Sequence, residues 1–89
     1  PTVQIDNEYT KVTEWFFEPE AETGMHIHEL NYVVVPMTTG ELTIESPDNK
    51  FSKANLKIGK SYTRNAGVHH NVINKNNFYF TFIEIEIKK

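Results

Sequence analysis

Residues 40–59, GELTIESPDNKFSKANLKIG, carry the pattern that decides the fold class. On both sides of the central segment SPDNK (46–50), apolar residues occupy every second position. These apolar residues are Leu42, Ile44, Ala54, Leu56 and Ile58. A period of two gathers apolar side chains on one face of a β-strand, and Ser, Pro, Asp and Asn are typical of turns. The stretch therefore predicts strands that each have one water-exposed face.

Turn segments recur along the whole chain and separate stretches of strand length. They are PEAETG (19–24), TTG (38–40), SPDNK (46–50), IGK (58–60), NAG (65–67) and NKNN (74–77). No segment shows the apolar period of a helix. Many short strands favour a closed sheet, because closure removes exposed edges. We therefore expect an all-β protein, a small antiparallel barrel or sandwich.

Three segments are apolar on both faces of the expected strand. They are WFF (15–17), VVV (33–35) and the start of FYFTFIEIEIKK (78–89). A domain of this size has a thin core and cannot bury both faces of such strands alone, so we expect a homodimer. At the end of the last segment isoleucines alternate with Glu84 and Glu86, and we expect these two glutamates on a water-exposed face.

Length and charge limit the classes of protein. With 89 residues and no cysteine, the chain is expected to form one domain over 1–89, without disulfides or a thiolate metal site. A net charge of −3, one arginine and scattered lysines argue against a nucleic-acid partner. Neither a membrane-length apolar run nor a secretory signal is evident in the sequence. A cytoplasmic protein with no membrane partner is therefore expected.

The histidines fall in two segments, GMHIHELNY (24–32) and GVHHNVIN (67–74). Alternation along a strand places His26 and His28 on one face, roughly 6 to 7 Å apart, close enough for both rings to reach one metal ion. In the second segment His70 shares its face with valines, so we expect it to point inward. An imidazole on an apolar face needs a polar partner. These three histidines are therefore either metal ligands or structural residues.

Together the two segments resemble the two signatures of the cupin superfamily. The first signature is H-x-H followed by a carboxylate and a glycine, and the second is G-x5-P-x-G-x2-H-x3-N. The matching positions are His26, His28, Gly40, Gly59, Gly67, His70 and Asn74. Asn65 stands where proline is usual. The resemblance covers nearly the whole chain and extends to small single-domain cupins associated with β-alanine degradation.

One departure concerns the metal site, because the usual glutamate after H-x-H is missing. Glu29 belongs to the opposite strand face, whereas Tyr32 shares the face of the two histidines and offers a phenol or phenolate oxygen. The resemblance implies a small jelly-roll barrel, commonly a homodimer. It also implies one divalent metal ion held by His26, His28 and His70. Tyr32 is then the fourth ligand or a general acid/base, and the metal is Fe, Mn, Ni or Zn.

Three residues are candidates for substrate binding. Arg64 either clamps a substrate carboxylate or forms a surface ion pair, and Tyr62 and Trp15 either line the cavity or belong to the core. Three neutral imidazoles leave the charge of a divalent ion uncompensated and favour an anionic ligand. We therefore expect a metal-binding small cupin that binds a small molecule.

The sequence leaves the activity open. One hypothesis is a metal-dependent enzyme of small-molecule metabolism, of dioxygenase, isomerase or lyase type, acting on a carboxylate-bearing metabolite. A second is a non-catalytic module that binds a metabolite or sugar, and a third is a structural barrel with relict histidines. Whether the protein is an enzyme is therefore uncertain from the sequence.

Overall fold

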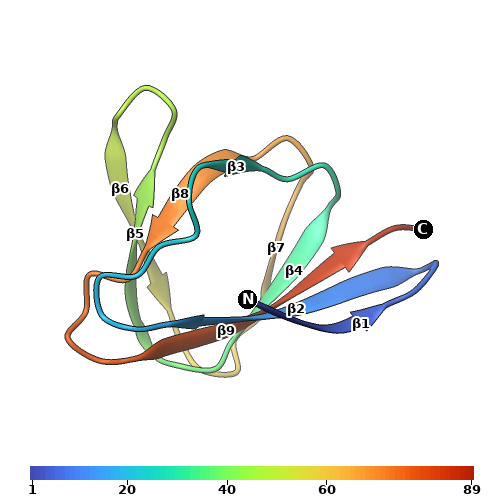
Figure 1. Ribbon diagram of the computed structural model, residues 1–89, viewed down its shortest axis with the longest axis horizontal. Helices are drawn as coiled ribbons and strands as arrows, with labels where there is room; N and C mark the ends of the chain where they lie inside the picture. Colours follow the sequence, from blue (N-terminus) through green and yellow to red (C-terminus); the bar gives the residue numbers. More distant parts are fainter.

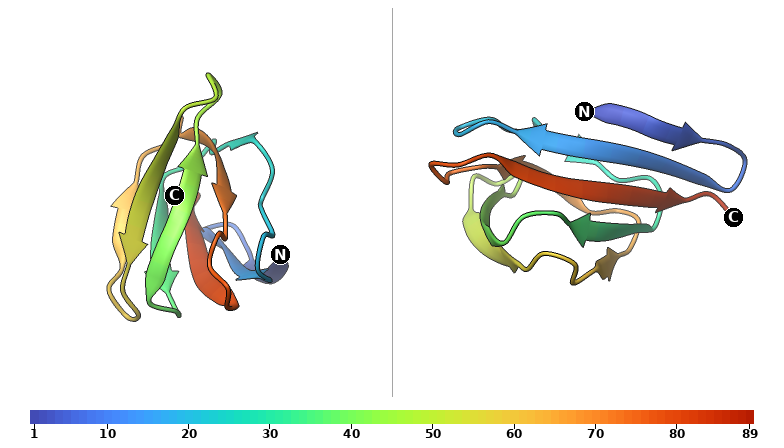
Figure 2. Two further views of the ribbon diagram at one scale, coloured as in Figure 1. Left: turned by 90° about the vertical axis from the view of Figure 1, so that its left-hand side faces the viewer. Right: turned by 90° about the horizontal axis from the view of Figure 1, so that it is seen from below.

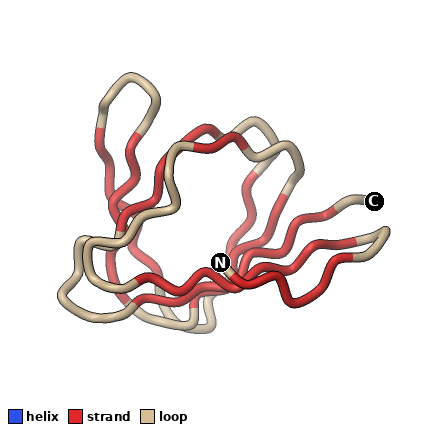
Figure 3. The backbone as a smooth tube through the Cα atoms, viewed as in Figure 1, coloured by secondary structure: helices blue, strands red, loops and turns tan.

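The computed structural model describes all residues, 1–89, and contains strands and loops but no helix (Figures 1 and 3). The strands are β1 (Thr2–Asp6), β2 (Thr10–Phe17), β3 (His26–Ile27), β4 (Tyr32–Pro36), β5 (Gly40–Glu45), β6 (Phe51–Leu56), β7 (Tyr62–Arg64), β8 (His69–Ile73) and β9 (Phe80–Ile87). The structure contains no helix that is long and apolar enough to cross a membrane.

The nine strands form two antiparallel sheets. The larger sheet has the order β1-β2-β9-β4-β7, and the smaller has the order β3-β8-β5-β6. The views in Figure 2 show the long strands β2 and β9 running side by side, with β4, β5 and β6 below them in the right-hand view. Strands that are distant in sequence are neighbours in both sheets, as in a jelly roll. The predicted all-β fold is therefore confirmed.

The core lies between the two sheets and is rich in aromatic side chains. Phe17, Phe80 and Phe82 are at most 5% exposed, and the rings of Phe17 and Phe82 stack with centroids 5.6 Å apart. The other buried apolar residues of this cluster are Tyr32, Val34, Leu42, Leu56 and Val72. Gly40 belongs to the same packing, because a Cβ there would lie 3.0 Å from the Phe80 ring. A side chain at this position would therefore require the rings of Phe80 and Phe78 to shift by a few tenths of an ångström.

Two predictions about strand faces need correction. Ile58 is 59% exposed, because β6 ends at Leu56 before the alternation does. Glu84 is only 7% exposed, so the prediction that it lies on a water-exposed face is wrong. In the register of the larger sheet Glu84 lies opposite Thr13 and Val34, which are both buried. The inner face of β9 therefore carries the carboxylates, and its isoleucines point outward.

The outer face of the larger sheet is apolar. Ile5 lies opposite Val12, Val12 opposite Ile85 and Ile85 opposite Val33, so these four side chains form one row across four strands. Ile5 is 48% exposed, and the other three are half-buried. We call this row the outer apolar row. It matches the expectation that several strands are apolar on both faces.

Candidate metal centre

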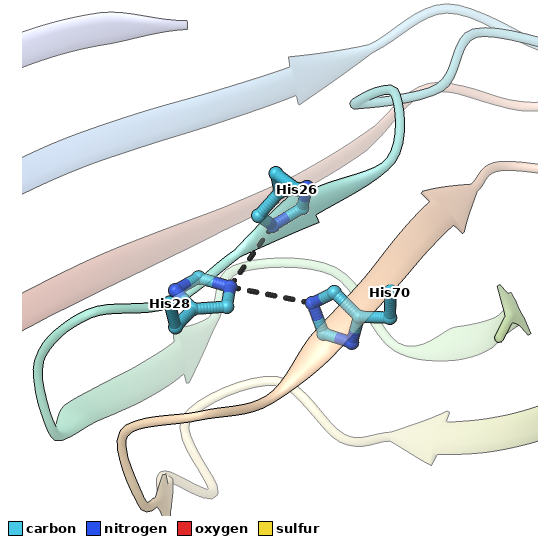
Figure 4. A group of neighbouring side chains, drawn as sticks. All are labelled: His26, His28 and His70. Carbon is cyan, nitrogen blue, oxygen red and sulfur yellow. Dashed lines mark hydrogen bonds between the residues drawn. The ribbon is translucent and has the colours of Figure 1, made fainter. Parts of the chain in front are cut away.

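Three histidines converge from two strands at one end of the smaller sheet. His26 on β3 lies directly opposite His70 on β8, and His28 follows one residue after the end of β3. Figure 4 shows the three rings turned toward one another, with the Nε2 atom of His28 between the other two. That atom lies 2.9 Å from Nε2 of His26 and 3.3 Å from Nε2 of His70. The structure thus brings together the three histidines singled out from the sequence.

Backbone hydrogen bonds fix the two histidine segments against each other. The His28 N–H donates to the Val68 carbonyl at 2.9 Å, and the Gly67 N–H donates to the His28 carbonyl at 2.7 Å. On the other side, the buried Asn71 side chain accepts from the Gly24 N–H at 2.9 Å. The loop before His26 and the turn before His70 are therefore held in a defined relation to β8.

The nitrogen spacing fits a divalent metal ion. Ligand nitrogens at about 2.1 Å from a metal in octahedral or tetrahedral geometry lie roughly 2.9 to 3.4 Å apart, which matches both separations. Nδ1 of His26 lies 2.8 Å from the Gly24 carbonyl oxygen. Because a carbonyl only accepts, Nδ1 of His26 must carry the proton, and its Nε2 presents a lone pair to the cluster. This donor set is one that Zn, Fe, Mn or Ni can use.

The electrostatics keep two of the rings in their ligand form. Burial, reinforced by the neighbouring His26, lowers the pKa of His28 to about 4. Burial also lowers the pKa of His70 to about 4, with smaller contributions from His26 and His28. Both imidazoles are therefore neutral at pH 7, as metal coordination requires.

Glu84 is the site residue that sequence reasoning missed. Its Oε1 lies 3.8 Å from Nδ1 of His28, on the side of the ring that faces away from the other two histidines. Burial, followed by the charge of Glu86, raises the pKa of Glu84 to about 7. Because His28 is neutral and 3.8 Å is too long for a hydrogen bond, the contact is polar but is not an ion pair. The same-face spacing of Phe80, Phe82 and Glu84 was the sequence signal for its inward position.

Glu84 and Glu86 also form a second group of potential donor atoms with His28. All donor atoms of this group lie within 4.8 Å of one another, as do those of the three histidines. In the second group, however, two carboxylates repel each other, and this repulsion contributes to the raised pKa of Glu84. The histidine cluster therefore has the better donor set for a metal ion.

Tyr32 lies against His28. Its ring stacks on the imidazole with centroids 4.0 Å apart, and only 2% of the residue is exposed. Burial, with a smaller effect of the Glu84 charge, raises the pKa of Tyr32 to about 12. The sequence left open whether Tyr32 acts as a phenol or as a phenolate. In the metal-free protein at neutral pH, the phenol is the form present.

A cavity of about 250 Å³ opens beside the histidines. Its polar wall includes His26, His70 and Glu84, and nine of its sixteen lining residues, counting Tyr32 and Tyr62, are hydrophobic. The apolar wall is formed by residues such as Val34, Leu42, Ile44, Leu56, Val72 and Phe82. The cavity therefore combines a compact polar end with a surface suited to a short carbon chain.

The three candidates for substrate binding are placed differently. Tyr62 and Arg64 line the cavity, and the Arg64 guanidinium carbon lies 4.6 Å from the centre of the Tyr62 ring. Arg64 forms no ion pair; its Nη1 donates to the Thr63 carbonyl at 3.1 Å. Trp15 does not line the cavity, because its ring packs behind His26 with centroids 6.4 Å apart. Of the two places considered for Trp15, the cavity wall and the core, its ring packs against the core, where it also stacks on Phe17.

Comparison with known proteins agrees with this fold. No family model matches the chain. The β-alanine degradation protein BauB of Pseudomonas aeruginosa is 52% identical over 88 residues, which cover 99% of this chain and 92% of BauB. The crystal structure of a cupin domain from Bordetella pertussis Tohama I has 58% identity and a TM-score of 0.96, covering 100% of this chain and 92% of that one.

A more distant structure shows the same fold. An RmlC-like cupin with a double-stranded β-helix fold from Methanocaldococcus jannaschii superimposes with a TM-score of 0.79 at 15% identity, covering 97% of this chain and 76% of that one. Identity at this level shows the fold alone, whereas the similarity to BauB extends over nearly the whole sequence. The chain therefore belongs to the cupin superfamily, in the same family as BauB.

Proposed function

We propose that this protein is a metal-binding cupin that acts on a small carboxylate-bearing metabolite, with one divalent ion held by His26, His28 and His70. The observation that carries the proposal is the convergence of three Nε2 atoms with separations of 2.9 and 3.3 Å between neighbours. The name of the relative BauB refers to β-alanine degradation. A role in small-molecule metabolism of that kind is part of the proposal.

The residues around the ion have separate roles in this proposal. When bound, a divalent ion supplies Lewis-acid chemistry at the polar end of the cavity. Arg64, which has no carboxylate partner, binds a carboxylate of the ligand through its guanidinium. The apolar wall holds the carbon chain and excludes water from it.

Two groups are suited to handling protons at the cavity wall. Tyr32 keeps its proton at neutral pH, because its pKa is raised to about 12, and therefore serves as a hydrogen-bond or proton donor. Glu84, with a pKa raised to about 7, exchanges a proton near neutral pH, where general acid/base catalysis is most efficient. Glu84 also lies 3.8 Å from Nδ1 of His28, so its carboxyl group is close to one of the proposed ligands.

Elemental analysis of tag-free protein tests the proposal. The wild type is expected to contain one equivalent of metal, which His26→Ala and His70→Ala lose. His69→Ala is the matched control, because this neighbouring histidine is exposed and lies on the opposite face of β8. A wild type that stays metal-free after incubation with Fe(II), Mn(II), Ni(II) and Zn(II) would refute the metal site.

A non-catalytic binding module is the alternative function. The hydrophobic majority of the cavity wall favours it, because such a wall suits ligand binding without any reaction. Turnover of short carboxylates by the metal-loaded protein, with oxygen uptake under Fe(II) measured first, separates the two functions. Binding without turnover of any of them supports the module.

We further propose that residues 1–89 form one cupin domain that works in the cytoplasm as a homodimer. The single core shared by both sheets supports the domain, and the metabolic relative supports the location. The outer apolar row, together with Phe16, which is 55% exposed, supports the dimer. Apolar surface of this kind on a sheet face is suited to a second copy of the chain.

A further inference from the structure

A second concave region is lined by the edge strands of the two sheets and by the loop that connects them. β6 is the last strand of the smaller sheet and β7 the last strand of the larger one, and the loop of residues 57–61 connects them. The groove between them has a volume of about 310 Å³. Its lining residues are Ala54, Asn55, Leu56, Lys57, Lys60, Ser61, Tyr62 and Arg64. Four of these, Ala54, Leu56, Tyr62 and Arg64, also line the histidine cavity, so the two spaces adjoin.

This edge groove is positively charged. Lys57, Lys60 and Arg64 line it, and no carboxylate does. Elsewhere five lysines pair with a carboxylate within 4.0 Å: Lys50, Lys53, Lys75, Lys88 and Lys89. Of the nine lysines and arginines in the chain, only Lys11 and the three cations of the groove form no such pair. A chain of net charge −3 thus gathers most of its unpaired positive charge at one site.

The backbone that carries the two lysines is held in place. Residues 57–60 form a turn in which the Lys60 N–H donates to the Lys57 carbonyl at 3.0 Å, and Gly59 supplies the required positive φ of 79°. The Gly59 N–H also donates to the Pro36 carbonyl at 2.9 Å, and the Ile58 N–H donates to the Thr39 hydroxyl at 2.9 Å. The turn is therefore anchored to the end of β4 and the loop after it. Such preorganisation reduces the cost of ligand binding.

We propose that the edge groove binds a second anionic group of the ligand, so that the ligand of this protein is a short dianion. One carboxylate lies at the histidine cluster, and a second carboxylate or a phosphate lies between Lys57 and Lys60. Arg64 lines both spaces. The binding of the first carboxylate at the histidine cluster rests on the proposed function. The binding of the second anionic group is inferred from the charge and shape of the groove.

Calorimetric titration with two matched acids tests this assignment. Pentanoate and glutarate have the same chain length and differ only in the second carboxylate, and 4-phosphonobutanoate replaces that carboxylate with a phosphonate. The metal-loaded wild type is compared with Lys57→Gln/Lys60→Gln. Lys50→Gln/Lys75→Gln is the control, because it removes the same charge from exposed lysines outside the groove.

We expect at least one dianion to bind the wild type and the control roughly tenfold more tightly than pentanoate, which corresponds to one charge-assisted contact pair. In Lys57→Gln/Lys60→Gln this preference should disappear while pentanoate affinity stays unchanged. Equal affinities of pentanoate and both dianions in the wild type, or a preference that survives in the lysine variant, would overturn the inference. Failure of both dianions to bind the wild type would also overturn the inference.

The two proposals fail in different ways. If pentanoate binds equally well to the metal-free protein, the metal site has no role in ligand binding, and the proposed function is wrong. The lysine-dependent preference for dianions would still support the edge groove in that case. Conversely, suppose that pentanoate binding depends on the metal but no dianion is preferred. The proposed function then stands, and the edge groove has no role in ligand binding.

Discussion

Replacing Glu84 by Gln should change how the stability of the metal-free protein depends on pH. The carboxyl is 7% exposed, and its pKa is raised from 4.5 to about 7, first by burial and then by Glu86. Below pH 4.5 the group is protonated in both the folded and the unfolded chain. Between pH 4.5 and 7 the unfolded chain loses this proton first, so the free energy of unfolding falls as the pH rises. Gln does not titrate, so the free energy of unfolding of the Gln variant does not fall for this reason.

The magnitude follows from the size of the shift. A difference of about 2.5 pKa units at 1.36 kcal/mol per unit gives at most about 3 kcal/mol. The variant should therefore gain up to about 3 kcal/mol over the wild type between pH 4.5 and pH 8. The depressed pKa values of His28 and His70 make both proteins less stable as the pH falls below 6.5, and this effect cancels in the comparison.

Urea denaturation of chelator-treated protein at five pH values from 4.5 to 8.5 measures this difference. Protein concentration must be fixed, because a dimer would make stability depend on it. Glu14→Gln is the control, since it changes a carboxylate to an amide on the outer face of the same sheet, opposite Ile83. Wild-type and Glu84→Gln curves that stay parallel within about 0.5 kcal/mol would show that the carboxyl is solvated, and the assignment of Glu84 to the site would be wrong.

Three further predictions concern the metal, the dimer and the core. Trp15, the only tryptophan, packs against His26, so Ni(II) or Co(II) should quench its fluorescence in the wild type but not in His70→Ala; equal quenching in both would contradict the histidine cluster. Ile85→Glu should convert a dimer to a monomer in light scattering, and an unchanged mass would exclude the outer apolar row as the interface. Gly40→Ala should lower the free energy of unfolding by roughly 1 to 3 kcal/mol, because the new Cβ crowds Phe80, and unchanged denaturation would refute that packing.

Much of the fold could be predicted from local patterns. Alternation identified Leu42 and Leu56 as buried, and turn residues separated the strands. The prediction from alternation was wrong for Glu84, because alternation alone does not say which face of a strand points to the core. The alternation favours the isoleucines as core residues, yet the outer face of the larger sheet is also apolar, and the inner face of β9 carries the carboxylates.

Only part of the candidate site could be predicted from local patterns. His26, His28 and His70 could be grouped because two of them share a strand face and the third lies in phase with valines. Residues whose role depends on packing between sheets, such as Trp15 and Glu84, could not be placed, since no local pattern fixes which strands lie opposite each other. The groove of Lys57 and Lys60 likewise depends on how the edge strands of two sheets are arranged, which no local pattern fixes.

The shortness of β3 has a consequence for how the protein matures. β3 pairs with β8 through only two residue pairs, His26 with His70 and Ile27 with His69. So small a ladder adds little stability by itself, and a slip of one residue would turn His70 away and bring His69 inward. A metal ion that coordinates residues of both segments would lock the correct alignment after synthesis. In chains that bind such an ion, both segments should be better protected from proteolysis than in metal-free chains.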